Sequence, residues 1–170
     1  MLSELDRKII MELQKDGRKS YSELSKMFGL SVSTLRRRVN ALLDKKVITI
    51  TAIPDPVQVG YELTSIIGFK VMRSELDNVV QEICKDTCNH LVSVGTGPYD
   101  IISWSLFKNV GELSDYLINR IPKIPGIIST ETSLSLRYVK RTYGWIGLDD
   151  PAESAVPSTG NRPDPILEKE

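Results

Sequence analysis

Residues 20–46, SYSELSKMFGLSVSTLRRRVNALLDKK, decide the fold of the N-terminal part of this 170-residue chain. Ser20 followed by Glu23 has the capping-box spacing, which predicts that a helix begins just after the serine. Gly29 suits the left-handed end of that helix, and Ser31 suits the N-cap of the next one. Two helices joined by a short turn that contains glycine are typical of a helix-turn-helix.

The second of these helices has an apolar stripe and an exposed face. The helical period of about 100° per residue places five apolar residues toward the core: Val32, Leu35, Val39, Leu42 and Leu43. Arg37, with Ser33 and Thr34, points outward and is placed to reach base edges, because a guanidinium can donate two hydrogen bonds to guanine. Arg36 and Arg38 lie on the flanks, where we expect them to hold phosphates.

Three arginines on a surface helix could also form nothing more than a solvated face. Here they lie on the second helix of a well-capped pair, and residues 33–41 contain no acidic side chain that could pair with them. The pattern therefore favours contact with double-stranded DNA.

Charge is distributed unevenly along the chain although the net charge is zero. Residues 1–50 contain eleven basic and six acidic side chains, whereas residues 51–140 contain eight and ten. A basic N-terminal part on a more acidic body suits a protein that binds a polyanion with one domain. Two cysteines and no apolar leader indicate a cytoplasmic protein, and no apolar run approaches the roughly 20 residues that span a membrane.

The periodicity also indicates where the domains begin and end. Leu5, Ile9 and Leu13 recur at helical spacing, so a first helix should pack on the helix pair. Residues 47–53 are rich in β-branched residues and predict a strand, after which Pro54 begins a linker. We expect a helix-turn-helix domain with its linking strand at residues 1–53 and a linker at 54–61. A second domain should follow at 62–148, and a disordered tail at 149–170.

The second half changes period and predicts the order β-α-β-β-α-β. The expected elements are a strand at 63–72, a helix from 76 with Ser74 as its N-cap, strands at 91–94 and 101–107, a helix at 113–121 and a strand at 128–138. This order is typical of a ferredoxin-like α+β domain, a four-stranded antiparallel sheet with two helices on one face. The alternation of the strand at 101–107 places three residues on one side: Ile102, Trp104 and Leu106. Two helices cannot cover both faces of the sheet, so we expect a second subunit to bury the uncovered face. The residues expected on that face are Ile66, Met72, Leu91, Ile101, Phe107 and Val139.

Several segments, in this order, resemble the Lrp/AsnC family of leucine-responsive and asparagine-operon regulators, also called feast/famine regulators. They are LDRKIIMELQKDGR at 5–18, SELSKMFGLS at 22–31, RRVNALLDKKVI at 37–48, GTGPYD at 95–100 and IPGI at 124–127. The resemblance implies a DNA-binding transcription regulator that responds to an amino acid or a related small molecule. It also implies a homodimer that assembles into tetramers or octamers, with no cofactor. Lys46 departs from the family pattern, because a glycine usually precedes the Val-Ile pair.

The resemblance also suggests an effector site. Asp100, three residues after Gly97, matches the Gly-x-x-Asp motif of the family and could pair with the ammonium group of an effector. A turn-capping role for Asp100 is equally open, since aspartate favours turns. The remaining effector candidates would be neighbours if two turns meet across a subunit interface: Thr96, Pro98, Tyr99, Ser129 and Thr130.

Two other functions are compatible with such a fold. One is an enzyme like the sirohaem decarboxylases that resemble this family, but those rely on histidine, and His90 is the only histidine here. The other is a DNA-packaging protein with little sequence preference, driven by phosphate contacts. Cys84 and Cys88 with His90 offer three possible metal ligands, one fewer than a structural zinc site requires. We expect no catalytic residue and no metal site.

Overall fold

The computed structural model describes residues 2–141, which form two compact units. The first unit contains the residues up to Ala52 together with the described residues that follow Tyr138, and the second spans Ile53–Tyr138. Within residues 2–141, no helix is both long enough and apolar enough to cross a membrane. The expected tail at 149–170, and the end of the second domain beyond residue 141, lie outside the described residues.

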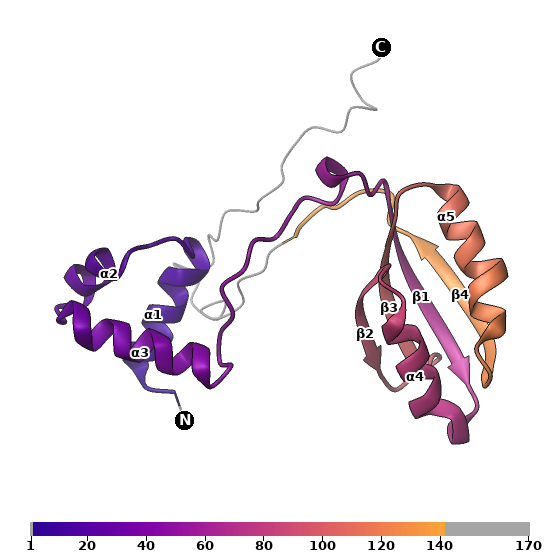
Figure 1. Ribbon diagram of the computed structural model, residues 1–170, viewed down its shortest axis with the longest axis horizontal. Helices are drawn as coiled ribbons and strands as arrows, with labels where there is room; N and C mark the ends of the chain where they lie inside the picture. Colours follow the sequence, from indigo (N-terminus) through magenta and orange to yellow (C-terminus); the bar gives the residue numbers. More distant parts are fainter. Residues whose placement is uncertain (1, 142–170) are drawn as a thin grey trace, which may run out of the picture. The chain divides into compact units, whose positions relative to one another are not determined.

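The first unit contains three helices: α1 (Glu4–Lys15), α2 (Tyr21–Phe28) and α3 (Val32–Asp44) (Figure 1). Ser20 and Glu23 form a complete capping box at the start of α2. Gly29 ends this helix with a φ of 63°, and the Ser31 hydroxyl then accepts from the Thr34 N–H at 3.1 Å. The predicted helix-turn-helix is confirmed, as is the helix before it.

Six buried apolar residues form the core of this unit: Ile9, Ile10, Leu24, Leu35, Val39 and Leu42. Leu43 packs against them while partly buried. The prediction that Val32 faces the core is wrong, because its side chain is 41% exposed. Val32 is the first residue of α3, and the buried stripe begins one turn later at Leu35.

Lys46 ends α3 in the left-handed conformation, with a φ of 54°. The Val47 N–H donates to the Leu42 carbonyl at 2.8 Å, and the Lys46 N–H donates to the Leu43 carbonyl at 2.9 Å. These two bonds are the Schellman pattern that usually has glycine at the left-handed position. Lysine therefore replaces the favoured glycine at this position without changing the turn.

The strand predicted at 47–53 does not form. These residues have no regular secondary structure, since no other strand of the described chain offers a hydrogen-bonded ladder to them. β-Branched residues favour an extended backbone, but only a partner strand makes a sheet. A short 3-10 turn at Val57–Val59 precedes the second unit's first strand.

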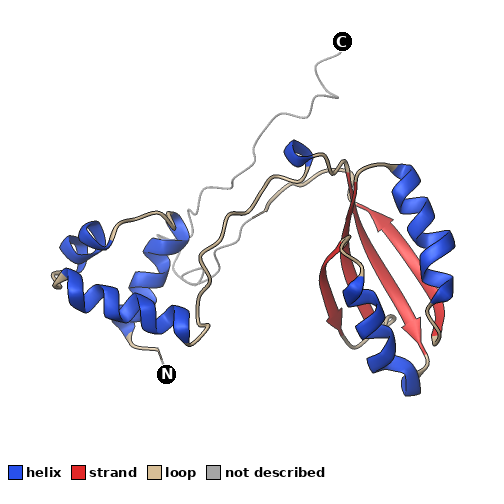
Figure 2. Cartoon of the chain, viewed as in Figure 1, coloured by secondary structure: helices blue, strands red, loops and turns tan. Residues whose placement is uncertain are grey.

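The second unit has the predicted β-α-β-β-α-β order (Figure 2). Its elements are β1 (Leu63–Val71), α4 (Leu76–Lys85), β2 (Asn89–Val94), β3 (Ile101–Phe107), α5 (Val110–Asp115) and β4 (Ile127–Leu134). After α5 the chain continues as a π-helical segment, Tyr116–Arg120, and a 3-10 turn, Ile121–Lys123. The strands lie in the order β2-β3-β1-β4, and all neighbouring pairs are antiparallel.

The helices cover only one face of this sheet. Ile67, Phe69 and Val71 point into the helix-facing core, as predicted. Ile101 and Phe107 belong to the same core, at 0% and 2% exposed, so their assignment to the uncovered face is wrong. Four apolar residues at 38–44% exposure lie on the open face instead: Ile66, Leu91, Ile102 and Trp104.

The reversed assignment of β3 has a physical cause. The residues of β3 that face the helices include Ser103 and Ser105, which are fully buried, while the larger Ile102 and Trp104 face outward. The Ser103 and Ser105 hydroxyls lie 3.1 Å apart, and the Ser105 hydroxyl donates to the Asn89 Oδ1 at 2.5 Å. Hydrogen bonds therefore satisfy the buried serines, and size alone does not identify the buried side.

Two smaller predictions about the second unit are also wrong. Ser74 is not the N-cap of α4, because it lies inside a 3-10 turn, Arg73–Glu75, and Glu75 occupies the cap position. The last strand ends at Leu134 rather than at residue 138. Beyond it, the Tyr138 hydroxyl donates to the Thr64 Oγ1 at 2.8 Å.

Candidate nucleic-acid interface and effector region

The outward face of α3 forms a shallow depression. Its lining residues are Val32, Ser33, Arg36, Arg37, Asn40, Ala41 and Asp44. Among the predicted DNA-binding residues, Ser33, Arg36 and Arg37 are brought together there, whereas Thr34 and Arg38 are not part of the lining. Val32 and Asn40 are members of this face that the sequence reasoning missed.

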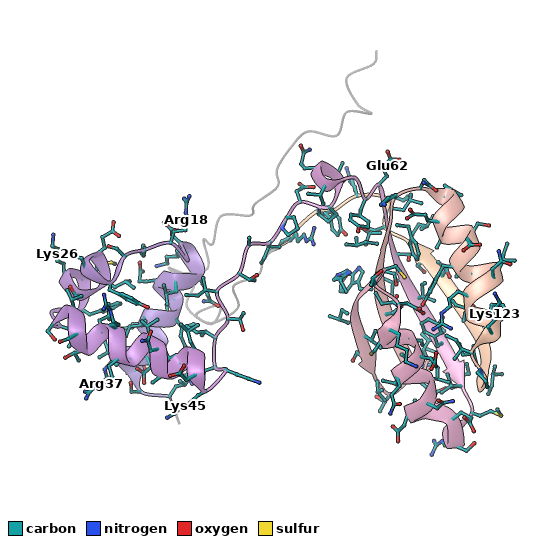
Figure 3. All side chains as sticks on the ribbon, in the orientation of Figure 1. Arg18, Lys26, Arg37, Lys45, Glu62 and Lys123 are labelled. Carbon is teal, nitrogen blue, oxygen red and sulfur yellow. The ribbon has the colours of Figure 1, made fainter. Side chains whose placement is uncertain are left out.

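Arg37 is exposed and points away from the helical unit (Figure 3). Within residues 2–141 it has no ion-pair partner, so its guanidinium is available to a ligand. Five N–H donors in a planar fork match the two acceptors on the major-groove edge of guanine.

Arg36 is exposed but restrained by an aromatic ring. Its Cζ lies 5.4 Å from the centroid of the Tyr21 ring, at the start of α2. The Tyr21 hydroxyl donates to the Asn40 Oδ1 at 3.3 Å. Arg36 therefore lies beside α2, and its guanidinium remains able to donate to a phosphate.

Arg38 is paired within the protein. Its Nη1 donates to the Asp6 Oδ1 of α1 at 3.1 Å. The Ser3 hydroxyl, and after it Arg38, hold the pKa of Asp6 below its ordinary value. Residues 33–41 do lack an acidic side chain, but Arg38 has an acidic partner in Asp6, which lies 32 residues earlier in the chain.

Ser33 and Thr34 lie next to the cap of α3. The Ser31 hydroxyl lies 3.0 Å from the Ser33 Oγ and donates to the Thr34 Oγ1 at 2.8 Å. Ser33 is exposed and faces the depression, while Thr34 is half-buried. Ser33 is thus the better placed of the two to reach a ligand.

In the second unit, the turn between β2 and β3 is anchored on β1 by Asp100. The Asp100 N–H donates to the Phe69 carbonyl at 2.9 Å, and the Asp100 carboxylate accepts from the Val71 N–H at 2.9 Å. Lys70 Nζ lies 3.7 Å from the same carboxylate. The turn-capping role is therefore present, and the ammonium group beside Asp100 comes from Lys70 of the same chain.

Tyr99 lies across β1. Its ring covers Gly68 so closely that a Cβ there would lie 2.5 Å from the Tyr99 Cγ. Its hydroxyl donates to the carboxylate of Glu131 on β4, and this bond raises the pKa of Tyr99. Neither Lys70 nor Glu131 was among the predicted site residues, although Lys70 is the single charge within the apolar run IIGFKV.

The other effector candidates are only partly brought together. Ser129 pairs with Lys70 across β1 and β4 and so shares the open face with Tyr99, whereas Thr130 pairs with Phe69 and points to the opposite side. Three residues remain exposed in the turn: Thr96, Gly97 and Pro98. One end of the sheet therefore combines a lysine, two carboxylates and a tyrosine.

No group of His, Cys, Asp and Glu side chains within residues 2–141 is placed to hold a metal ion. His90 lies beside Trp104, with ring centroids 6.4 Å apart. Cys84 is exposed, and Cys88 is half-buried, with burial raising the pKa of its thiol to about 11. A high pKa makes that thiol a poor nucleophile.

Comparison with known proteins links both regions to one family. The profile of the AsnC-type helix-turn-helix domain matches residues 2–43, and the profile of the Lrp/AsnC ligand binding domain matches residues 64–145. An uncharacterized HTH-type transcriptional regulator of Pyrococcus furiosus is 36% identical over 144 residues, which cover 84% of this chain and 97% of that protein. The HTH-type transcriptional regulator FL11 of Pyrococcus horikoshii is 37% identical, over 83% of this chain and 93% of its own.

Solved structures show the same fold. The AsnC protein of E. coli superposes with a TM-score of 0.77 at 29% identity, covering 84% of this chain and 98% of that one. A transcriptional regulator of Neisseria meningitidis, solved as a complex with L-Met, has a TM-score of 0.77 at 23% identity, over 84% of this chain and 94% of its own. At 23% identity, the likeness to the Neisseria protein shows a shared fold alone.

Proposed function

Because the chain belongs to the Lrp/AsnC family of transcriptional regulators, we propose that α3 reads operator DNA and that an amino acid bound to the second unit modulates this binding. A DNA-binding regulator with a small-molecule-binding domain is the function that the two matched domains support. The observation that carries the DNA-binding part is the depression on α3, in which Arg37 is exposed.

The residues of α3 have different roles in this proposal. Arg37 and Ser33 reach base edges in the major groove, where guanine offers O6 and N7 as acceptors. Arg36 binds a backbone phosphate, which fixes the register of the protein but reads no sequence. Arg38 keeps α1 in place through Asp6 and contributes to the positive field around α3. Thr34 supports the helix cap beside Ser31.

The effector part rests on the charges at one end of the sheet. A free amino acid carries an ammonium and a carboxylate group, and Asp100 and Lys70 offer the complementary pair of charges. The Neisseria relative in fold was solved with L-Met, an amino acid of this kind. We propose that the effector binds at this end, next to Tyr99 and Ser129, with the turn residues Thr96, Gly97 and Pro98 around it. Thr130 faces the other side of the sheet and takes no part in this site.

The alternatives have less support. The relatives are transcriptional regulators rather than enzymes. An enzyme would need acid-base groups in the second unit, but the one histidine of the chain, His90, lies against Trp104. A packaging protein would need phosphate contacts alone, whereas Arg37 is free to reach bases.

Selection of bound DNA from a random pool tests the proposal. The selection is run at two salt concentrations, with and without a mixture of the common amino acids. We expect a palindromic consensus whose enrichment changes when the mixture is present. Enrichment of no sequence would reject sequence-specific regulation in favour of packaging, and a consensus unaffected by every amino acid would reject the effector part alone.

A further inference from the structure

Tyr21 lies where α2 meets α3 and contacts two side chains of the DNA-facing helix. The Arg36 guanidinium lies over its ring at 5.4 Å from the centroid, and the Asn40 Oδ1 accepts from its hydroxyl at 3.3 Å. Arg36 and Asn40 are one helical turn apart, and both line the depression on α3. One aromatic side chain of α2 therefore restrains two neighbouring side chains of α3.

These contacts restrict what Arg36 can do. A free arginine loses rotamer freedom when it binds an anion, which weakens the binding. The Tyr21 ring attracts the guanidinium through its quadrupole, so part of that freedom is lost before DNA arrives. Among the described residues 2–141, no aromatic ring lies under the Arg37 guanidinium, so this side chain keeps its rotamer freedom until it meets a base edge.

The hydrogen bond to Tyr21 also selects a role for Asn40. An asparagine that reads adenine must donate and accept at once. The Asn40 Oδ1 accepts from Tyr21, which occupies one of its two lone pairs and orients the amide, so a bidentate contact to adenine would compete with this bond. Both Nδ2 donors remain available, so Arg36 and the Asn40 Nδ2 together offer donors, which suits phosphate oxygens.

We infer that Tyr21 is a positioning residue of the DNA interface, an inference that rests on the DNA binding proposed above. It orients Arg36 and Asn40 so that both donate hydrogen bonds to the phosphate backbone. The ring acts on Arg36, and the hydroxyl acts on Asn40.

Salt dependence of binding tests this role, because each phosphate contact contributes about one unit to the slope of log K against log salt. The probes are a duplex that carries the selected site and a duplex of unrelated sequence. We compare Tyr21→Leu, Tyr21→Phe, Arg36→Ala and the double variant Tyr21→Leu/Arg36→Ala. Arg18→Ala is the charge-matched control, since its side chain is 95% exposed and lies on the other side of the helical unit from Arg37 (Figure 3).

We expect Tyr21→Leu and Arg36→Ala each to lower the slope by about one unit and to weaken binding about two- to fivefold on both duplexes. The double variant should lower the slope little more than either single variant, because both remove the same charged phosphate contact. Tyr21→Phe keeps the ring and should keep the wild-type slope, as should Arg18→Ala. Additive losses of slope, or a wild-type slope in Tyr21→Leu, would overturn the inference.

Measurements on the folded wild-type protein keep the inference testable if Tyr21→Leu does not fold. A guanidinium above the ring places the Arg36 side-chain protons in its shielding region, so we expect upfield NMR shifts for them and none for those of Arg37. Unshifted Arg36 protons would overturn the inference. Tyr21→Phe, Asn40→Ala and their combination test the role of the hydroxyl. Each single variant should weaken DNA binding, and the combined variant should bind no more weakly than the weaker single variant. Additive losses of affinity in the combined variant would overturn the role of the hydroxyl.

The proposed function and the present inference fail in different ways. A wild-type protein that enriches no DNA site contradicts the proposed function. A wild-type protein that binds its selected site, with Tyr21 variants that match it in affinity and slope, contradicts only the role of Tyr21.

Discussion

Arg37 and Arg38 are adjacent in the chain but have different surroundings. Arg38 is held by Asp6, whereas Arg37 is exposed at the outward face of α3. Asp6 occupies one donor of the Arg38 guanidinium and offsets its charge, so Arg38 is less available to DNA than Arg37. The sequence places both residues on the exposed half of the helix, but only the fold of α1 against α3 separates their roles.

Arg37→Ala should weaken binding to the selected site by about 1–3 kcal/mol and relax the preference at one base position, because a bidentate contact to guanine is lost. Repeating the selection with the variant measures this. Arg38→Ala is the comparison, and it should mainly lower stability, because Asp6 loses its partner. An unchanged consensus with Arg37→Ala would rule out base reading by this residue.

Lys46→Gly should raise the free energy of unfolding by about 0.5–1 kcal/mol, because a residue with a Cβ is strained in the left-handed conformation. The φ of Lys46 is 54°, whereas that of Lys45 is −78°. Lys45→Gly is therefore the matched control, and it should lower stability. Denaturant unfolding measures both, and equal effects at the two positions would contradict the strain.

At the level of elements, local signals proved sufficient for the helices of the first unit. The capping box of Ser20 and Glu23 and the left-handed Gly29 were predicted because each depends on residues within one turn. The missing strand at 47–53 and the reversed face of β3 were mispredicted because both depend on partners far away in the chain. Lys70 and Glu131 were not identified for the same reason, since strand pairing brings them to Asp100 and Tyr99.

Acid should destabilise the helical unit. Hydrogen bonds from the Ser3 hydroxyl to Asp6, from Lys15 to Glu12 and from the Ser20 hydroxyl to Glu23 lower the pKa of each carboxyl in the folded protein. The unfolded chain then binds more protons, so the stabilisation is present above about pH 4.5 and is lost as pH falls through the lower folded pKa values.

Denaturant unfolding followed by far-UV circular dichroism at several acidic pH values measures this loss. Ser20→Ala removes the partner of Glu23 and should cost about 1 kcal/mol at neutral pH, with a smaller dependence on pH below about 4.5. Ser22→Ala is the control, because Ser22 is an exposed residue of the same helix and is not its N-cap. Stability that does not change with acid pH would contradict the assigned pKa directions.

Gly68→Ala should destabilise the sheet by about 1–3 kcal/mol, because the added methyl group would displace the Tyr99 ring. Gly95→Ala is a matched control, since nothing lies within 4 Å of a Cβ at that position. Thermal unfolding compares the two variants. Adding Tyr99→Leu to Gly68→Ala should recover part of the lost stability. Equal stability of the two alanine variants would show that the Tyr99 ring moves aside at no cost in free energy.

For the whole molecule, the open face of the second unit is the most informative surface. Its four exposed apolar residues lie on adjacent strands: Ile66, Leu91, Ile102 and Trp104. A contiguous apolar sheet face is typical of a subunit interface. The sequence predicted that this face would be covered by a second copy, although it placed Ile101 and Phe107 on the wrong side.

Trp104→Glu should convert a dimer into monomers, because a charge would be buried between two apolar sheet faces. Sedimentation velocity of both proteins measures the change, and it also reports any tetramer or octamer built from dimers. Val110→Glu is the control, since Val110 is 68% exposed on α5, away from the open face. A dimer that survives Trp104→Glu would place the subunit interface elsewhere.

Lys46 also has a consequence for how such a protein can change over generations. Lysine and glycine codons differ at more than one base, and every single-base step between them encodes glutamate or arginine, each of which keeps a Cβ at the strained turn. Neither intermediate on these shortest routes relieves the strain, so glycine is not reached by two steps that are each favourable. A protein that is stable enough for its task can therefore keep this lysine indefinitely.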